Sequence, residues 1–257
     1  MIPRSGCPRL SVIIPAYNEE LRLPETLRQV GGYLAGQPYE SEVLVVDDGS
    51  TDGTAAAADS GAGIPSLRLI QHPDRANHGK GAAVTLGMLE ARGDFRLFMD
   101  ADNSTTLDQI AGFWPWFEKG YEVVVGSRKV RGARVVVHQA WYKELAGRWG
   151  NFLIRALAVP GISDTQAGFK MFSRRAAEAI FPRLTIARWG YDIEILAIAR
   201  LLNLRVCEAP IVWVNAPGSK VRSSAYLQVI AEVWRIRRNL KSGVYHRPAD
   251  APDLEKG

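Results

Sequence analysis

The stretch Leu97-Phe98-Met99-Asp100-Ala101-Asp102 is the part of this 257-residue chain that indicates its fold most clearly. The apolar residues 95–99 predict a β-strand, and two carboxylates follow it one residue apart. At a strand exit both carboxylates can point into the same space, where hard oxygen ligands hold Mg²⁺ or Mn²⁺. Asp-x-Asp is also common in solvated turns, and the apolar strand in front of the pair favours the metal-binding interpretation.

Strand and helix patterns alternate on both sides of this stretch. The other expected strands are residues 10–15, 42–46, 66–71 and 122–126, and the expected helices are residues 23–34, 54–58, 81–91 and 107–119. Pro15 is expected to end the first strand. The alternation predicts an α/β fold with a largely parallel sheet and helices on both faces.

Polar residues cluster directly after three of the expected strands, at residues 17–19, 47–50 and 100–102. Ligands of parallel α/β sheets bind beyond the carboxyl ends of the strands, so we expect these clusters to converge on one site. The carboxylate of Asp48 can accept hydrogen bonds from the N–H groups of a nucleobase, and Gly49 permits a tight turn. Ser50 or Asp52 can equally serve as a helix N-cap.

Gly79-Lys80-Gly81 precedes an expected helix and is similar to a phosphate-binding loop. It lacks the spacing of a P-loop, which excludes a Walker-type ATPase, and a simple turn with a solvated lysine is the alternative. No Gly-x-Gly-x-x-Gly follows the first strand, which excludes a Rossmann dinucleotide oxidoreductase. The four histidines stand in no nucleophile–base spacing typical of a hydrolase.

The composition, with 47% hydrophobic and 23% charged residues, is that of a globular protein with a sizeable core. The net charge is +5, and Lys and Arg concentrate in residues 128–155 and 220–241. This asymmetry indicates an anionic partner near the second half of the chain. Cys7 and Cys207 lie in no metal-ligand or redox spacing, so we expect two reduced thiols.

The sequence also bears on membrane contact. Residues 1–9 lack the apolar core of a signal peptide, and no apolar run approaches the roughly 20 residues that span a bilayer. Residues 135–159 and 226–240 each place aromatic and aliphatic side chains on one helical face with cations at its margin. Interfacial helices have this pattern, and so does the core face of an ordinary packed helix. We expect a cytoplasmic protein in peripheral contact with the inner face of a membrane.

Four segments, in this order, resemble the inverting family 2 glycosyltransferases of the GT-A fold. They are residues 11–20 (SVIIPAYNEE), 45–52 (VVDDGSTD), 79–81 (GKG) and 99–102 (MDAD). Four later segments are similar to the dolichyl-phosphate β-glucosyltransferases and, next, to the polyprenyl-phosphate mannosyl- and glucosyltransferases. They are residues 125–128 (VGSR), 164–170 (DTQAGFK), 188–194 (RWGYDIE) and 217–220 (PGSK). The resemblance extends from about Leu10 to Lys241.

The resemblance implies one GT-A domain in residues 1–241, with nucleotide-sugar binding in residues 10–126, the acceptor and membrane side in residues 127–241, and a tail in residues 242–257. It implies transfer of a hexose, in particular glucose from UDP-glucose, to polyprenyl or dolichyl phosphate, with inversion and with Mg²⁺ or Mn²⁺. The alternatives are mannose from GDP-mannose, a polysaccharide acceptor, and a non-catalytic nucleotide-sugar-binding scaffold. A nucleic acid partner is not expected.

The chemistry of the implied reaction suits the basic residues after Arg128. A lipid phosphate is already an anion at neutral pH and can attack the anomeric carbon without a strong general base. The larger task is to stabilise the departing nucleoside diphosphate with metal and guanidinium groups. The mannosyl relatives often have a glutamine at the position of Ser104, where it serves as another metal-site ligand. The serine in this sequence counts against mannose as the donor sugar.

The resemblance also implies roles for single residues. Those expected at the nucleoside or its phosphates are Pro15, Tyr17, Glu19, Asp48, Arg75 and Lys80. Those expected at the metal and the donor diphosphate are Asp100 and Asp102, and those at phosphates of donor or acceptor are Arg128 and Arg148. The sugar and acceptor side is assigned to Asp164, residues 166–170, Trp189, Asp192 and Glu194. We expect a catalytic part for Asp102, Asp164, Arg128 and Arg148.

Overall fold

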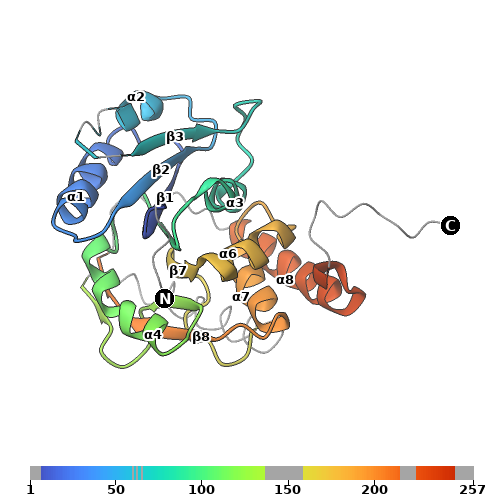
Figure 1. Cartoon of the computed structure of the whole chain (residues 1–257). Coiled ribbons are helices and arrows are strands. Elements are labelled where there is room, and N and C mark those ends of the chain that lie inside the picture. The colour runs from blue at the N-terminus through green and yellow to red at the C-terminus, as the bar shows by residue number, and fades with distance from the viewer. Residues whose placement is uncertain are drawn as a thin grey trace.

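The computed structural model describes residues 7–59, 61, 63–64, 66–136, 159–214 and 224–246, with side chains from residue 228 onward in the last range. Its centre is a seven-stranded sheet in the order β3-β2-β1-β4-β7-β5-β8 (Figure 1). The strands are β1 (Leu10–Ala16), β2 (Ser41–Asp47), β3 (Leu67–Gln71), β4 (Phe95–Met99), β5 (Val123–Ser127), β7 (Phe169–Ser173) and β8 (Val206–Pro210). All neighbouring pairs except those with β7 are parallel, which confirms the predicted sheet.

Strand β7 runs antiparallel to both of its neighbours, β4 and β5. All five of its residues are buried, because it lies in the middle of a sheet covered on both faces. Since β7 runs in the opposite direction, it begins beside the end of β4, where Phe169 pairs with Met99. The next residue, Lys170, pairs with Val125 near the end of β5. This strand, which the sequence analysis did not assign, therefore brings a lysine to the edge where β4 ends.

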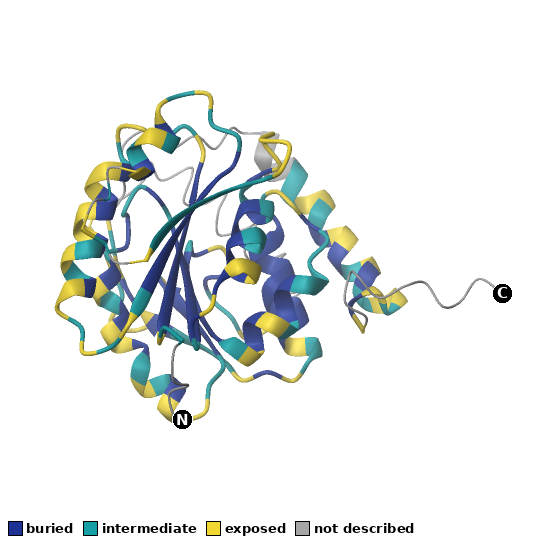
Figure 2. Ribbon diagram, turned by 45° about the horizontal axis from the view of Figure 1, so that its top comes forward, coloured by how far each residue is buried: buried dark blue, intermediate teal, exposed yellow. Residues whose placement is uncertain are grey.

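Helices cover both faces of the sheet, as predicted. On one face lie α1 (Leu23–Ala35), α2 (Thr54–Asp59), the 3-10 helix η1 (Leu107–Gly112) and α4 (Trp114–Glu118). On the other lie α3 (Lys80–Glu90), α6 (Arg174–Ile180), η2 (Phe181–Arg183), α7 (Tyr191–Leu201), α8 (Ser224–Ser242) and η3 (Val244–His246). Side chains alternate along each strand, so Val12 belongs to the core under α1 and Ile13 to the core under α3. Figure 2 shows the buried residues gathered in the strands and on the inner sides of the helices.

A small two-stranded parallel sheet, β6 (Arg134–Val135) with β9 (Val212–Trp213), lies next to the end of β4. The contact is made by backbone hydrogen bonding, because the carbonyl of Ser104 accepts the N–H of Val214 at 2.9 Å. Ile211 is the single residue between β8 and β9, so the chain turns directly from the main sheet into the small one. This arrangement carries Trp213 to the carboxyl edge of the main sheet.

Two expectations about single elements are wrong. Strand β1 continues through Pro15 to Ala16. Its pairing with β4 ends at Ile13, so the N–H that Pro15 lacks is not needed for a hydrogen bond to β4. The helix expected at residues 107–119 divides into η1 and α4. Pro115 cannot donate into the preceding turn, and it occupies the first turn of a new helix instead.

The segments predicted to contact a membrane are described unequally. Residues 226–240 form most of α8, which confirms that they are helical. Most of residues 135–159, and the tail beyond His246, lie outside the described residues. Among the helices that the structure describes, none combines the length and the apolar character needed to cross a bilayer. Cys7 and Cys207 are free, as predicted.

Gly87 of α3 is expected to tolerate no side chain, because a Cβ there would lie 2.5 Å from Cγ2 of Ile13 and 2.8 Å from Cγ2 of Val46. Gly87→Ala should lower the free energy of unfolding by about 1–3 kcal/mol, the usual cost of overpacking a core. Gly32 of α1 is the matched control, since a Cβ there meets nothing within 4 Å. Gly32→Ala should stabilise by about 0.5–1 kcal/mol. Urea denaturation measures both, and equal stabilities would contradict the packing argument.

Candidate active site

The polar clusters that follow β1, β2 and β4 lie along one edge of the sheet, as the sequence predicts. The backbone N–H of Asn18 donates to Ser50 Oγ at 2.9 Å, and that of Glu19 donates to Thr54 Oγ1 at 2.7 Å. These bonds join the cluster after β1 to the cluster after β2. Of the two proposed caps, Asp52 accepts the N–H of Thr54 at the start of α2, whereas Ser50 accepts from Asn18.

The buried carboxylate of Asp48 fixes the turn in front of α3. It accepts hydrogen bonds from the side chain of Asn77 and from two successive backbone N–H groups, the second being that of Gly79, at 2.8 to 2.9 Å. Gly79 has a φ of 101°, a conformation that favours glycine. The next residue, Lys80, donates from Nζ to Asp100 Oδ1 at 2.5 Å. One short segment therefore links the end of β2 to the end of β4.

Near the ends of β4, β5 and β7, three ion pairs lie among the residues that the structure describes. They are Lys80–Asp100, Lys170–Asp192 and Arg128–Asp164. Lys170 of β7 also donates to the carbonyl of Ala167 at 2.7 Å. Arg128, just past β5, donates through Nε and Nη2 to the two oxygens of Asp164, each at 2.8 Å. The pairs are close enough to influence one another. The negative charge of Asp192 favours the protonated form of Lys80 as well as that of Lys170.

Burial and the neighbouring charges shift the pKa values of these groups. Burial opposes the charge of Lys80, but the carboxylates of Asp100 and Asp192 outweigh it and raise the pKa of Lys80 above that of an ordinary lysine. In the more enclosed pair, burial lowers the pKa of Lys170 and raises the pKa of Asp192. The Lys80 side chain is 30% exposed and that of Lys170 is 0% exposed. Lys80 is therefore a cation that a ligand can reach, whereas Lys170 supports the site from within.

A pocket opens beyond the end of β4. Its lining residues are Asp100, Ser104, Thr105, Arg128, Ala167, Gly168, Ile211 and Trp213. The guanidinium carbon of Arg128 lies 5.3 Å from the centre of the Trp213 ring. Asp100 can occupy the wall because residue 168 is glycine, since a Cβ there would lie 2.1 Å from Asp100 Oδ2. The pocket thus presents a carboxylate and a guanidinium to the same volume.

Asp100 and Asp102 are the residues that fit a divalent cation. The side chain of Asp100 is 35% exposed, and Asp102 is half-buried, with its Oδ1 accepting the N–H of Ser104 at 3.0 Å. Among the described residues, no three or more His, Cys, Asp and Glu side chains gather around one point. Proteins commonly hold Mg²⁺ with one or two carboxylates together with substrate phosphates, so this carboxylate pair fits such an ion.

The residues predicted to bind the nucleoside differ in exposure. Pro15 is buried inside β1, and Tyr17, directly after that strand, is 42% exposed. Glu19 is half-buried, and Arg75 is exposed with a φ of 54°. Trp189, predicted to lie on the sugar side, is half-buried. These positions leave the side chains of Tyr17 and Arg75 accessible to a ligand at the edge of the sheet.

The carboxylate of Glu194 forms its hydrogen bonds with groups that do not line the pocket. Its buried carboxylate accepts from the N–H and Oγ1 of Thr185, the N–H of Ile186 and the hydroxyl of Tyr245, at 2.7 to 3.1 Å. These bonds make Glu194 a support for the segment that begins at Thr185, and it is not among the residues that line the pocket. Arg148 and residues 217–220 lie outside the described residues.

Sequence reasoning missed Thr105, Ile211 and Trp213 of the pocket lining. It also missed Glu208 of β8, whose carboxylate accepts the N–H groups of Ser163 at 2.7 Å and of its neighbour at 2.9 Å, and so fixes the loop that carries Asp164. Glu208, Ile211 and Trp213 reach the site through the pairing of β8 with β5 and of β9 with β6. No local signal marks these three residues, because the paired strands are far apart in the sequence, whereas Thr105 closely follows Asp102.

The pH dependence of stability should reveal the Arg128–Asp164 pair. Burial disfavours the ionised carboxyl, but the hydrogen bonds and charge of Arg128 outweigh this and hold the pKa of Asp164 below the ordinary value of 3.8. Ionised Asp164 therefore stabilises the fold above pH 3.8, and this contribution is lost as the pH falls through the lower, folded-state value. Asp164→Asn, which leaves Arg128 without its charged partner, should cost about 3–5 kcal/mol near neutral pH.

The urea midpoints of wild type and Asp164→Asn, measured from pH 7 downward, check this linkage. Their difference should stay constant above about pH 5 and should shrink below about pH 4. A difference that is the same at pH 3 as at pH 7 would contradict it.

The fold and the site together define a class of protein. A mostly parallel sheet with an acidic pair after a central strand, and with Asp100 of that pair and Arg128 in one pocket, is the architecture of a GT-A glycosyltransferase. The chain belongs to glycosyl transferase family 2, whose sequence model matches residues 11–181. The family and the fold inferred from the sequence are thereby confirmed.

The chain is similar to several proteins named dolichyl-phosphate β-glucosyltransferase. It is 34% identical over 253 residues to that of Dictyostelium discoideum, covering 92% of this chain and 76% of that protein. It is 36% identical over 230 residues to that of Drosophila melanogaster, covering 82% and 69%. With the human protein, the identity is 32% over 253 residues, covering 92% and 77%.

Solved structures with the same fold come from enzymes that are more distant in sequence. Glucosyl-3-phosphoglycerate synthase from Mycobacterium tuberculosis in complex with UDP superposes with a TM-score of 0.65 at 21% identity, covering 91% of this chain and 81% of that one. The same synthase with Mn²⁺, UDP and glucosyl-3-phosphoglycerate gives a TM-score of 0.62 at 20% identity, covering 96% and 82%. At these identities the likeness concerns the fold.

Proposed function

We propose that this protein transfers glucose from UDP-glucose, with inversion, to the phosphate of dolichol or another polyprenol. The observation that carries the proposal is that Asp100 and Arg128 line one pocket at the carboxyl edge of the sheet. A carboxylate suited to a metal–diphosphate group and a guanidinium suited to a phosphate thus act on the same volume. The curated relatives named dolichyl-phosphate β-glucosyltransferase, at 32 to 36% identity, support glucose and a lipid phosphate as the two substrates.

In this proposal the chain's own groups bind and orient the two anionic substrates. Asp100 and Asp102 would hold Mg²⁺ or Mn²⁺, which supplies positive charge to the leaving diphosphate when it is bound. Lys80 contributes a further cation on the donor side, because it lies beside Asp100 and its side chain is partly exposed. Arg128, held rigidly by Asp164, would bind a phosphate of the donor or the acceptor.

The reaction itself needs little proton transfer. An oxygen of the acceptor phosphate forms a bond to the anomeric carbon of glucose while the bond from that carbon to the diphosphate oxygen breaks, and the configuration inverts. The phosphate is ionised at neutral pH, so no strong base is required. The task of the protein is electrostatic: preorganised positive groups stabilise the negative charge that develops on the leaving diphosphate.

The remaining assignments follow the division of the chain. Residues 10–126 would bind the nucleotide sugar, with the nucleoside at Pro15, Tyr17, Glu19, Asp48 and Arg75. Residues 127–241 would form the acceptor and membrane side, including Arg148 by resemblance. Trp189 and Asp192 would lie on the sugar side, and the contacts of Glu194 support a role beneath that side.

A transfer assay with radiolabelled donors tests the proposal. UDP-glucose with dolichyl phosphate and Mg²⁺ or Mn²⁺ should place label in the lipid fraction, and GDP-mannose should place little there. Chelation of the metal should abolish the transfer, and its return should restore it. Undecaprenyl phosphate in a parallel assay distinguishes the two kinds of polyprenol. No label in the lipid fraction with either donor would overturn the proposal.

Two variants of the acidic pair extend the same assay. Asp102→Asn should lower the transfer rate by about 100-fold, equivalent to about 2.7 kcal/mol of transition-state stabilisation. Gly168→Ala should also lower it strongly, because its Cβ would displace Asp100. Asp59→Asn, at an exposed aspartate of α2, is the matched control and should retain full activity. Full transfer activity in Asp102→Asn would contradict a metal-binding role for Asp102.

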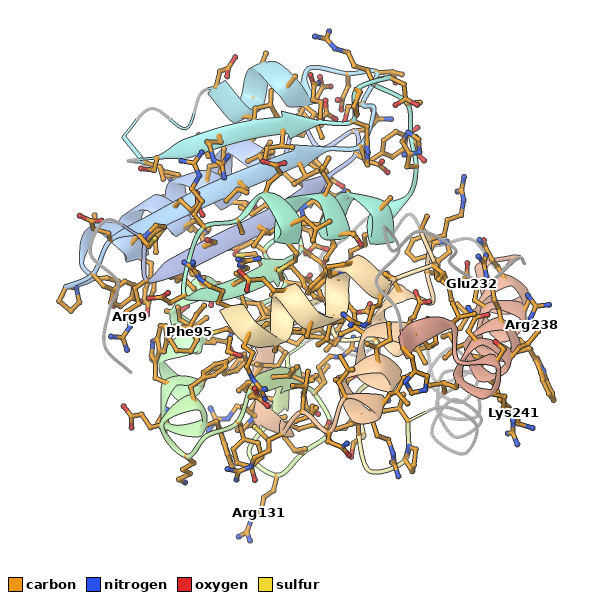
Figure 3. The ribbon with its side chains drawn as sticks, turned by 45° about the vertical axis from the view of Figure 1, so that its right-hand side comes forward. Arg9, Phe95, Arg131, Glu232, Arg238 and Lys241 are labelled. Atoms are coloured by element: carbon orange, nitrogen blue, oxygen red, sulfur yellow. The ribbon has the colours of Figure 1, made fainter. Side chains whose placement is uncertain are left out.

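We further propose that α8 rests on the lipid surface from which the acceptor comes. Ile230 is 45% exposed and Trp234 is 59% exposed on this helix. Arg235, Arg238 and Lys241 are exposed on the same helix, and Figure 3 shows the last two extending away from the body of the molecule. Exposed apolar side chains beside cations match an anionic lipid surface, where each basic residue contributes about 1 kcal/mol.

Sedimentation with liposomes tests this surface. The protein should pellet with phosphatidylserine-containing vesicles at low salt and should be released as the salt concentration rises. Trp234→Ser combined with Arg238→Glu should leave most of the protein in the supernatant. Lys119→Glu, at an exposed lysine directly after α4 on the opposite face of the sheet, changes the charge equally and should leave the protein in the pellet. A wild-type protein that remains in the supernatant at low salt would contradict the assignment.

A further inference from the structure

Residues 185–190 pack directly against the turn that carries Lys80. The carbonyl of Ala187 accepts the backbone N–H of Ala82, in the first turn of α3, at 3.0 Å. A Cβ on Gly79 would lie 2.8 Å from that carbonyl oxygen, and a Cβ on Gly81 would lie 2.9 Å from it. Only glycine on both sides of Lys80 permits so close an approach. The position of Lys80 therefore depends on where residues 185–190 lie.

Helix α8 holds the same segment from the other side. Glu232 Oε2 accepts the backbone N–H of Gly190 at 2.7 Å, and Oε1 accepts from Gln228 Nε2 at 3.1 Å. Gly190 is the residue in front of α7, where N–H groups lack partners within the helix. A Cβ on Gly190 would lie 2.9 Å from Glu232 Oε2, so glycine is required for this contact as well. Figure 3 shows Glu232 closer to the body of the molecule than Arg238 and Lys241.

The bond from Glu232 reaches the part of the segment that is nearest to the ion pairs. At the far end, Asn239 of α8 donates to Thr185 Oγ1 at 3.2 Å, and Thr185 is also held by Glu194. At the near end, Gly190 leads directly into Asp192, the partner of Lys170 and a neighbour of Lys80. Without the Asn239 contact, Glu194 would still hold Thr185. Glu232, in contrast, provides the hydrogen bond that connects α8 to Gly190.

We propose that Glu232 is a positioning residue of the donor site. By accepting the N–H of Gly190, it holds residues 185–190 against the first turn of α3 and so fixes Lys80 against Asp100. The inference rests on the proposed function, in which Lys80 contributes to binding the donor diphosphate. It also makes α8, the helix assigned to the lipid surface, a structural part of the donor site.

Two substitutions separate this role from general stabilisation. Glu232→Ala removes the acceptor, and the KM for UDP-glucose should rise about tenfold, the effect of losing a hydrogen bond to a charged group. Its kcat and its KM for dolichyl phosphate should change less than twofold. Glu232→Gln keeps an oxygen that can accept from Gly190 and should restore the donor KM to within about threefold of wild type. Glu118→Ala, at an exposed glutamate of α4, is the control.

Hydrogen exchange gives a measurement that needs no substrate. In Glu232→Ala, the backbone amides of residues 79–83 should exchange about tenfold faster, because the acceptor of the Ala82 N–H is no longer held in place. Gly190→Ala, whose Cβ would lie 2.9 Å from both Cβ and Oε2 of Glu232, should produce the same change with the Glu232 carboxylate still present in the chain. This second variant decides the question if Glu232→Ala does not fold.

The two proposals fail in different ways. If wild type transfers no glucose, the proposed function is wrong, and hydrogen exchange still decides the role of Glu232. Wild-type exchange at residues 79–83 in both variants would overturn the inference. So would a lower melting temperature with an unchanged donor KM, or a Glu232→Gln variant as impaired as Glu232→Ala, because a purely structural role predicts those results.

Discussion

The site depends on charged side chains that hold one another in place where the strands end. They include the ion pairs Lys80–Asp100, Lys170–Asp192 and Arg128–Asp164. In the buried Lys170–Asp192 pair, removal of one partner would leave an uncompensated charge at a cost of about 3–5 kcal/mol, so this pair fixes its members firmly. Charges held in this way need not reorganise when a leaving group becomes negative. The side chains of Lys80 and Arg128 remain about a third exposed, and these two cations can therefore reach a ligand.

The antiparallel strand β7 joins the two parts of the sheet on which these charges stand. Strands β1, β2 and β4 supply the acidic clusters, and β5 supplies Arg128. Because β7 runs against both neighbours, it starts at the edge where they end, and Lys170 enters the site from a strand that would otherwise point away. The loop before β7 contributes Asp164 and Gly168, so the same connection orients Arg128 and makes room for Asp100.

Local patterns in the sequence were sufficient for the fold and for the place of the site. Continuous apolar runs predict buried strands, and the alternation with helices makes most of those strands parallel. The carboxyl ends of parallel strands share one edge, so residues directly after them, such as Asp48 and Asp100, must come together whatever the details of packing. Pro115 shows the limit, because a helix predicted from apolar spacing divides where one residue cannot donate.

Contacts between residues that are distant in the chain determine which groups meet at that edge. The carboxylate of Asp48 accepts from the turn before Lys80, Glu194 is enclosed beside Thr185, and Trp213 arrives through the pairing of β9 with β6. Glu232 reaches the same region from α8. Local sequence patterns are enough to place the acidic groups after the strands. A carboxylate accepts a hydrogen bond from any donor in reach, so these patterns do not specify its partners. Which donors meet the acidic groups depends on contacts between residues that are distant in the chain, and those exist only once the sheet and its helices have packed.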